Sequence, residues 1–166
     1  MRKDAGITLA EVMVVIAIVG ILMAIAVPNW LSWRAKAKIN GALTNLRGDI
    51  EMTNLRAIRE NAHVTILFSS DAYTVFIDNG AGGGTASNWV RDGGEILLKN
   101  RQLAAGVRIN MGATTFPVRP TGSTTKGLRF NGRARPSSLG TVVLADTRGE
   151  IRKIVVNLPG RARIVY

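Results

Sequence analysis

An apolar run near the N-terminus constrains the fold of this chain more than any other feature of its sequence. From Ile7 to Val27 the residues ITLAEVMVVIAIVGILMAIAV contain a single charged residue, Glu11. As a helix rising about 1.5 Å per residue, this run is about 31 Å long, enough to cross the ~30 Å hydrocarbon core of a bilayer. The sequence therefore predicts one membrane-spanning helix.

Glu11 discriminates between three explanations of the run: a cleaved secretory signal, a plain membrane anchor and a helix that assembles with other subunits. A secretory signal has a shorter apolar stretch and no reason to contain a carboxylate. A plain anchor also avoids one, because an unpaired charge in hydrocarbon costs at least ~2.5 kcal/mol. The carboxylate therefore favours an assembly helix.

The segment GITLAEVMVVIAIVGILMAIAVPNW, which begins at Gly6, resembles the N-terminal signal of type IV pilins and type II secretion pseudopilins along its whole length. In that family a prepilin peptidase cuts after the glycine and methylates the new amine, which implies cleavage between Gly6 and Ile7. Counted from Ile7, Glu11 takes the position of the family's assembly glutamate, and Pro28 takes that of its helix-kinking proline. The resemblance implies that Glu11 pairs with the N-terminal amine of a neighbouring subunit.

Two residues depart from the usual family pattern. Ile7 stands where the family most often has phenylalanine, and Ala10 stands where it most often has a larger aliphatic residue. Both variants are common in minor pilins and pseudopilins, so they argue against a typical major pilin. Basic residues flank both sides of the apolar run, so charge alone does not orient it. By resemblance, residues 1–6 are cytoplasmic and the rest lies outside, first at the bacterial inner membrane and then in a pilus or pseudopilus filament.

Beyond the apolar run, the helical pattern continues in amphipathic form, with apolar residues three or four positions apart. The helix is expected to end at about Glu60 or Asn61. The apolar stripe comprises Ile39, Leu43, Leu46, Ile50 and Ala57.

After His63 the sequence changes to short β-type runs separated by Gly, Asn and Asp. VTILFSS and YTVFID are expected to form a hairpin, and the turn at residues 147–150 a second one. Two further segments, at 80–88 and 116–127, have no apolar pattern and are expected to be mobile loops. The other strand candidates are residues 95–99, 107–111, 127–131, 140–146, 150–157 and 162–166.

These patterns predict an α+β, pilin-like fold, in which a long N-terminal helix packs on an antiparallel β-sheet head domain. The expected parts are a cleaved leader (1–6), a transmembrane assembly helix (7–28), the amphipathic half of the same helix (29–61) and a β-rich head (62–166). The head resembles the GspH/FimT group of minor pilins and pseudopilins through VTILFSSDAYTVFID, GLRFNGRARPSSLGTVVLADTRGEIRKIVVN and GRARI.

The sequence contains no recognisable catalytic set. It has no cysteine and a single histidine, His63, and no Ser/His/Asp arrangement or metal-ligand spacing is apparent. We therefore expect no enzymatic activity, no cofactor and no metal. The chain is better regarded as the substrate of a peptidase.

The chain is strongly basic, with a formal net charge of +11, which suits nucleic acid, anionic lipid or acidic surfaces. Arg161 and Arg163 are two residues apart, so on a strand they point to one face. Arg148 and Arg152 are expected to extend the same patch across a hairpin. The sequence from Gly160 to Arg163 resembles the C-terminal motif of FimT-like minor pilins that take up DNA, although related pseudopilins without a DNA role end similarly.

Several functions remain open at the sequence level. The leading interpretation is a structural subunit of a type IV pilus or type II secretion pseudopilus, a minor pilin or pseudopilin at the filament tip or in its initiation. The alternatives are a DNA-binding minor pilin of natural transformation, a major pilin and an unprocessed membrane-anchored binding protein. The expected partners are other pilins or pseudopilins, the prepilin peptidase, the inner membrane with its assembly platform and, for the second interpretation, DNA.

Overall fold

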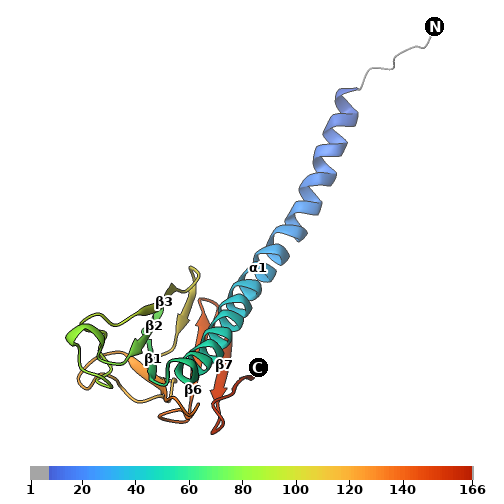
Figure 1. Cartoon of the computed structure of the whole chain (residues 1–166). Helices are drawn as coiled ribbons and strands as arrows, with labels where there is room; N and C mark the ends of the chain where they lie inside the picture. The colour runs from blue at the N-terminus through green and yellow to red at the C-terminus, as the bar shows by residue number, and fades with distance from the viewer. Residues whose placement is uncertain (1–7, 166) are drawn as a thin grey trace. The chain divides into compact units, whose positions relative to one another are not determined.

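The structure, a computed structural model, describes residues 8–165. The chain forms two compact units, Met1–Ala37 and Lys38–Tyr166, and the second, called the head below, contains all eight strands. The helix α1 spans Leu9–Glu60 and includes Pro28. Figure 1 labels α1 and several strands of the head.

Local hydrogen bonds define both ends of α1. At its start, the Thr8 hydroxyl accepts a hydrogen bond from the Glu11 N–H at 3.2 Å, the arrangement of an N-cap residue. At its end, Asn61 adopts a left-handed φ of 46°. The Asn61 N–H donates to the Ile58 carbonyl and the Ala62 N–H to the Ala57 carbonyl, each at 3.2 Å, which is a Schellman motif. The predicted end of the helix at Glu60 or Asn61 is confirmed.

The part of α1 within the head buries one stripe of side chains. All five residues of the predicted stripe are buried, and Ala42, Asp49 and Thr53 lie on the same buried side of the helix. The predicted amphipathic pattern is therefore confirmed.

The strands of the head form two four-stranded antiparallel sheets rather than one. The first sheet has the order β3-β2-β1-β5 and the second the order β4-β6-β7-β8. Both predicted hairpins are present, as β1–β2 and β6–β7. The strands are β1 His63–Phe68, β2 Ala72–Asp78, β3 Leu97–Gln102, β4 Val107–Ile109, β5 Lys126–Phe130, β6 Gly140–Asp146, β7 Ile151–Val156 and β8 Ala162–Val165.

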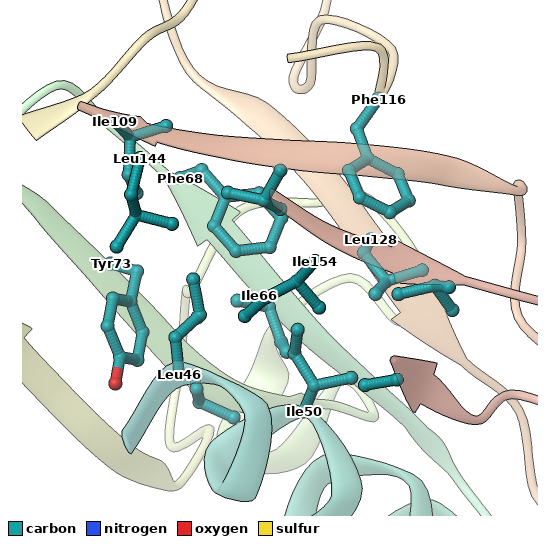
Figure 2. Close-up of a cluster of buried hydrophobic side chains, with 14 of the residues drawn as sticks. Leu46, Ile50, Ile66, Phe68, Tyr73, Ile109, Phe116, Leu128, Leu144 and Ile154 are labelled. Atoms are coloured by element: carbon teal, nitrogen blue, oxygen red, sulfur yellow. The ribbon is translucent and has the colours of Figure 1, made fainter. Parts of the chain in front are cut away.

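One hydrophobic core joins α1 to both sheets. Figure 2 shows Leu46 and Ile50 of α1 among side chains from β1 and β2 of the first sheet and from β4, β6 and β7 of the second. Phe116, from the loop before β5, stacks on Phe68 with ring centroids 5.8 Å apart. The core therefore depends on segments from the whole length of the head.

A buried polar cluster links α1 to the first sheet. The carboxylate of Asp49, 7% exposed, accepts a hydrogen bond from the Tyr73 hydroxyl at 2.6 Å and forms an ion pair with Arg101 at 3.1 Å. Burial and the hydrogen bond to Asp49 both raise the pKa of Tyr73, so this hydroxyl remains a donor. These contacts join residues of α1, β2 and β3.

The segment between β2 and β3, which includes the loop predicted at residues 80–88, contacts the first sheet through the buried carboxylate of Asp78. Asp78 accepts hydrogen bonds from the Thr65 hydroxyl and from the N–H groups of Asn88 and Trp89. The Trp89 ring stacks under Arg129, whose guanidinium lies 4.4 Å from the ring centroid. Glu95, expected to begin a strand, is buried and accepts the Gly80 N–H instead, so β3 begins two residues later.

His63 lies beside this segment. Its Nδ1 is 2.5 Å from the Ser87 hydroxyl. Burial lowers the pKa of His63 and the positive charge of Arg129 lowers it further, while Asp78 opposes the shift. The imidazole is therefore held neutral to a lower pH than a free histidine.

Candidate assembly helix and basic groove

The N-terminal part of α1 is the first candidate site. Glu11 lies in the first helical turn and is exposed. A carboxylate at this position is stabilised by the positive end of the helix dipole. The expected partner of Glu11, the amine created at Ile7, and the cleavage site at Gly6 lie outside the described residues. The structure thus positions the carboxylate at the N-terminal end of the described helix.

Among residues 8–165, the apolar side chains that follow Glu11 as far as Val27 are all exposed. Large side chains from Val12 to Val27 are 42–70% exposed. The helix is long and apolar enough to cross a membrane. Because such a surface is unfavourable in water, this segment requires lipid or other apolar helices around it.

A groove between α1 and β8 is the second candidate site, and we call it the basic groove. It has a volume of about 560 Å³ and is lined by Arg47, Glu51, Asn54, Leu55, Gly160, Arg161, Ala162 and Arg163. Its three arginines face a single carboxylate, Glu51, which pairs with Arg47 at 3.0 Å. Among the described residues, Arg161 and Arg163 form no ion pair with an acidic group. The groove therefore presents unneutralised positive charge.

The turn between β7 and β8 positions the two arginines. Gly160 has a φ of +73°, and its N–H donates to the Asn157 carbonyl at 2.7 Å. An added Cβ on Gly160 would lie 2.9 Å from the Ala134 carbonyl oxygen and 2.8 Å from the Asn54 side chain. Glycine is therefore required here both for its conformation and for the close approach of its neighbours.

The structure brings together only two of the four arginines that were expected to form one patch. Arg161 and Arg163 share one face of β8, as predicted, and because Ala162 between them is buried, that face is opposite the core. Arg163 pairs with Val155, whereas Arg152 shares its side of β7 with the buried Ile154. Arg152 therefore lies on the opposite face, where it pairs with Glu150.

Arg148 is distant from the groove for a different reason. It lies in the β6–β7 turn, where its N–H donates to Asp146 at 2.9 Å. That turn and the β7–β8 turn lie at opposite ends of β7, about 20 Å apart for six residues at ~3.3 Å each. The expectation that Arg148 and Arg152 extend the patch was wrong.

Arg47 is a residue of the basic groove that the sequence analysis did not identify. It belongs to α1 and reaches the groove because the helix packs beside β8. Its exposed position, beside the apolar stripe of the amphipathic helix, carried no signal of a partner more than a hundred residues later in the chain.

The fold and the candidate assembly helix together define a pilin-type subunit, with an N-terminal helix long and apolar enough to cross a membrane and an α+β head. Comparison with known proteins supports this definition. Residues 1–27 match the model of the prokaryotic N-terminal methylation motif. Residues 42–160 match the model of the type II transport protein GspH, and the chain belongs to the GspH family.

Several curated proteins are similar in sequence. The pilin-like protein PilA1 of Thermus thermophilus is 29% identical, over 96% of this chain and 97% of its own length. The type IV major pilin protein PilA of Myxococcus xanthus is 49% identical over 45 residues, and the type II secretion system core protein G of Vibrio cholerae is 50% identical over 46 residues. These two matches span 20% and 32% of the respective relatives.

Two solved structures share the fold. The minor pseudopilin EpsH from the type 2 secretion system of Vibrio cholerae superposes with a TM-score of 0.54 at 11% identity, covering 77% of this chain and 95% of EpsH. The solution structure of Escherichia coli GspH gives a TM-score of 0.57 at 16% identity, covering 79% of this chain and 89% of that protein. At these identities the similarity establishes the fold, and the predicted α+β pilin-like architecture is confirmed.

Proposed function

We propose that this chain is a minor structural subunit of a pilin-type filament, a type IV pilus or a type II secretion pseudopilus, and that it acts at the filament tip or in initiation. The observation that carries the proposal is the single carboxylate of the exposed apolar helix, Glu11, in a chain of the GspH family. Other pilins or pseudopilins are its partners within the filament.

In this proposal the prepilin peptidase cuts between Gly6 and Ile7 at the inner membrane and methylates the new amine. The amine of Ile7 then pairs with Glu11 of a neighbouring subunit, and the head lies outside the cytoplasm. The pairing neutralises two charges that would otherwise lie alone in hydrocarbon. The net stabilisation from this pair is small, because both ions remain desolvated. Its main effect is to fix the register between neighbouring subunits. Pro28 provides a local perturbation of α1, because proline removes one hydrogen bond of the helix.

The charge of the head favours a minor over a major subunit. Residues 38–166 contain 18 Lys and Arg against 9 Asp and Glu, a net charge of +9. A fibre made of this head alone would place identical positive heads side by side, which is electrostatically unfavourable. Mixed into a filament of other subunits, the same head meets surfaces of a different charge.

The test of the proposed function follows the mature protein in its native host. Mass spectrometry is expected to find a mature chain beginning at a methylated Ile7, and deletion of the prepilin peptidase is expected to restore the start at Met1. Glu11→Val is expected to insert into the membrane as well as the wild type but to be lost from sheared filaments. Met13→Val, a change in the same exposed helix, is the control. Full incorporation of Glu11→Val would refute the pairing.

A DNA-receptor pilin is a second candidate, and the grouping of Arg161 and Arg163 with Arg47 favours it. Guanidinium groups suit phosphate oxygens. In a gel retardation assay the full-length protein is expected to bind duplex DNA with steep salt dependence, and Arg161→Gln/Arg163→Gln is expected to reduce the log–log salt slope by about 2. Lys99→Gln/Arg108→Gln removes two exposed charges outside the groove and serves as control. No retardation of wild-type protein at low salt would exclude this candidate.

A further inference from the structure

A short segment of α1 just beyond the apolar run combines exposed tryptophans with positive charge. Trp30 and Trp33 are 56% and 66% exposed, and the side chains of Arg34 and Lys36 are exposed beside them. No acidic residue occurs anywhere from residue 12 to residue 48. We call these four residues, two aromatic and two basic, the collar.

The two charges of the collar are not neutralised by the chain itself. Among residues 8–165, neither Arg34 nor Lys36 forms an ion pair with an acidic side chain. The next basic residue, Lys38, differs, because its ammonium donates a hydrogen bond to the Ala105 carbonyl at 3.2 Å. The collar therefore offers two cations to a ligand from outside the chain.

Helix geometry places the charge of Arg34 at the depth of lipid headgroups. Trp30 lies three residues, about 4.5 Å, beyond Val27, the last residue of the apolar run. Side chains of a helix tilt toward its N-terminus, and the Arg34 guanidinium lies over the Trp30 ring, 5.6 Å from its centroid. A bilayer ~40–45 Å thick with a ~30 Å hydrocarbon core has headgroup layers of about 5–7 Å. With the apolar run in the hydrocarbon, the guanidinium lies in one of these layers.

The two charges lie on nearly opposite faces of the helix. At 3.6 residues per turn, Arg34 and Lys36 are about 200° apart around the axis. A single neighbouring helix or strand contacts one face, whereas small anions that surround the helix reach both. Phosphate groups fit the guanidinium fork of arginine, and tryptophan rings are enriched at headgroup level. This arrangement favours phospholipid headgroups over one protein partner.

We propose that the collar binds the headgroups of anionic phospholipids around α1. The proposal rests on the proposed function only for the leaflet, which is the outer leaflet of the inner membrane because the head lies outside the cytoplasm. While the subunit is in the bilayer, these lipids neutralise Arg34 and Lys36. When α1 moves into a filament, neighbouring subunits replace them.

The test measures which lipid gathers at the collar of the full-length protein. The protein is reconstituted in vesicles of equal parts phosphatidylglycerol and phosphatidylcholine, with bromine on the acyl chains of one lipid or of the other. Bromine quenches nearby tryptophan, so the ratio of quenching in the two series reports enrichment at Trp30 and Trp33. Trp89 belongs to the head, outside the hydrocarbon, and adds equal emission to both series. We expect about threefold or greater enrichment of phosphatidylglycerol.

Matched variants assign that enrichment to the collar. Arg34→Gln/Lys36→Gln lies outside the apolar run, so it is expected to insert normally and to show no preference between the two lipids. Lys99→Gln/Arg108→Gln, with the same change in net charge on the head, is expected to retain the wild-type enrichment. Arg34→Gln and Lys36→Gln as single changes are each expected to lose only part of it, because each cation binds on its own face.

A further arm separates a lipid headgroup from free phosphate, which offers the same oxygen atoms. Inorganic phosphate added at constant ionic strength is expected to leave the enrichment unchanged, because phosphatidylglycerol is already concentrated in the layer that contains the collar. Higher ionic strength is expected to weaken the enrichment, since the attraction between the charges is screened. Displacement of the lipid by inorganic phosphate would assign the collar to a soluble anion.

Three further results would overturn the proposal. They are equal quenching by the two brominated lipids in the wild type, wild-type enrichment in Arg34→Gln/Lys36→Gln, or complete loss of enrichment in one of the single variants. Reconstitution in vesicles requires neither processing at Gly6 nor other subunits. Retained lipid enrichment in a chain that never enters filaments would therefore refute the proposed function and leave the lipid site intact.

Discussion

At the scale of single residues, Gly160 shows how the backbone supports the basic groove. Its positive φ and its contacts with Ala134 and Asn54 both exclude a side chain. Gly149 also has a positive φ, of 83°, but open space around it. The two glycines therefore separate the effect of conformation from that of crowding.

We predict that Gly149→Ala lowers the free energy of unfolding by about 1 kcal/mol, the strain of a left-handed alanine. Gly160→Ala is expected to lower it by at least about 1 kcal/mol more, because neighbouring atoms must also move. Urea unfolding of both variants measures the difference. Equal losses would show that crowding at Gly160 is relieved at no cost.

The lowered pKa of His63 predicts a dependence of stability on pH. The unfolded chain titrates near the ordinary value of about 6.5 and the folded chain below it. Below pH 6.5 the unfolded state therefore binds more protons, so stability is full above that pH and declines as the pH falls toward the folded pKa. Urea unfolding at pH 7.5 and 5.5 is expected to show this loss for the wild type and less of it for His63→Asn. If both proteins lost the same stability between pH 7.5 and 5.5, titration of groups other than His63 would be the cause.

Tyr73 and Asp49 predict the effect of breaking a buried polar contact. Tyr73→Phe removes the donor to Asp49 and leaves that buried carboxylate with Arg101 as its remaining partner. We expect a loss of about 1–3 kcal/mol in the free energy of unfolding. A double-mutant cycle with Asp49→Asn is expected to give a coupling of at least about 0.5 kcal/mol, and additive losses would show that the contact contributes no stability.

At the scale of elements, the single helix α1 combines two different patterns of apolar residues. Its first part is uniformly apolar around the axis, whereas the part in the head is apolar on one stripe. Leu46 and Leu55 lie in that second part, and their exposed fractions are 0% and 67%. The same substitution at the two sites measures what burial against the sheets contributes.

Leu46→Ala is expected to lower the free energy of unfolding by about 2–5 kcal/mol, through lost burial and the cavity left in the core. Leu55→Ala is expected to change it by less than about 0.5 kcal/mol. Denaturant unfolding of the two variants provides the comparison. Similar losses at both sites would contradict the packing of α1 against the head.

At the scale of the whole molecule, the charge of the head predicts that this subunit does not polymerise alone. Its net charge of +9 repels identical heads. Expressed with the prepilin peptidase and assembly platform but without other pilins, the chain is expected to remain in the membrane fraction. Immunoblots of sheared filaments and membranes measure this, with co-expression of the other subunits as the positive control. Abundant filaments of this chain alone would favour a major pilin.

The sequence by itself determined the features that depend on local spacing. The apolar run with Glu11, the buried stripe of α1 and the two hairpins follow from periods of 3.6 and 2 and from turn residues close in the chain. The pairing of β5 with β1 and of β4 with β6 depends on contacts between distant segments. The shared outward face of Arg161 and Arg163 was predictable from their spacing on one strand.

The placement of Arg152 and Arg47 was decided by the tertiary structure. Arg152 faces the opposite way because the register pairs Val155 with Arg163, and a shift of one residue would exchange the faces of β7. That register depends on the turn at Gly160 and on the residues of the same chain that pack against this turn, Asn54 and Ala134. Arg47 joins the basic groove because α1 packs beside β8, a relation that no local pattern in the sequence contains.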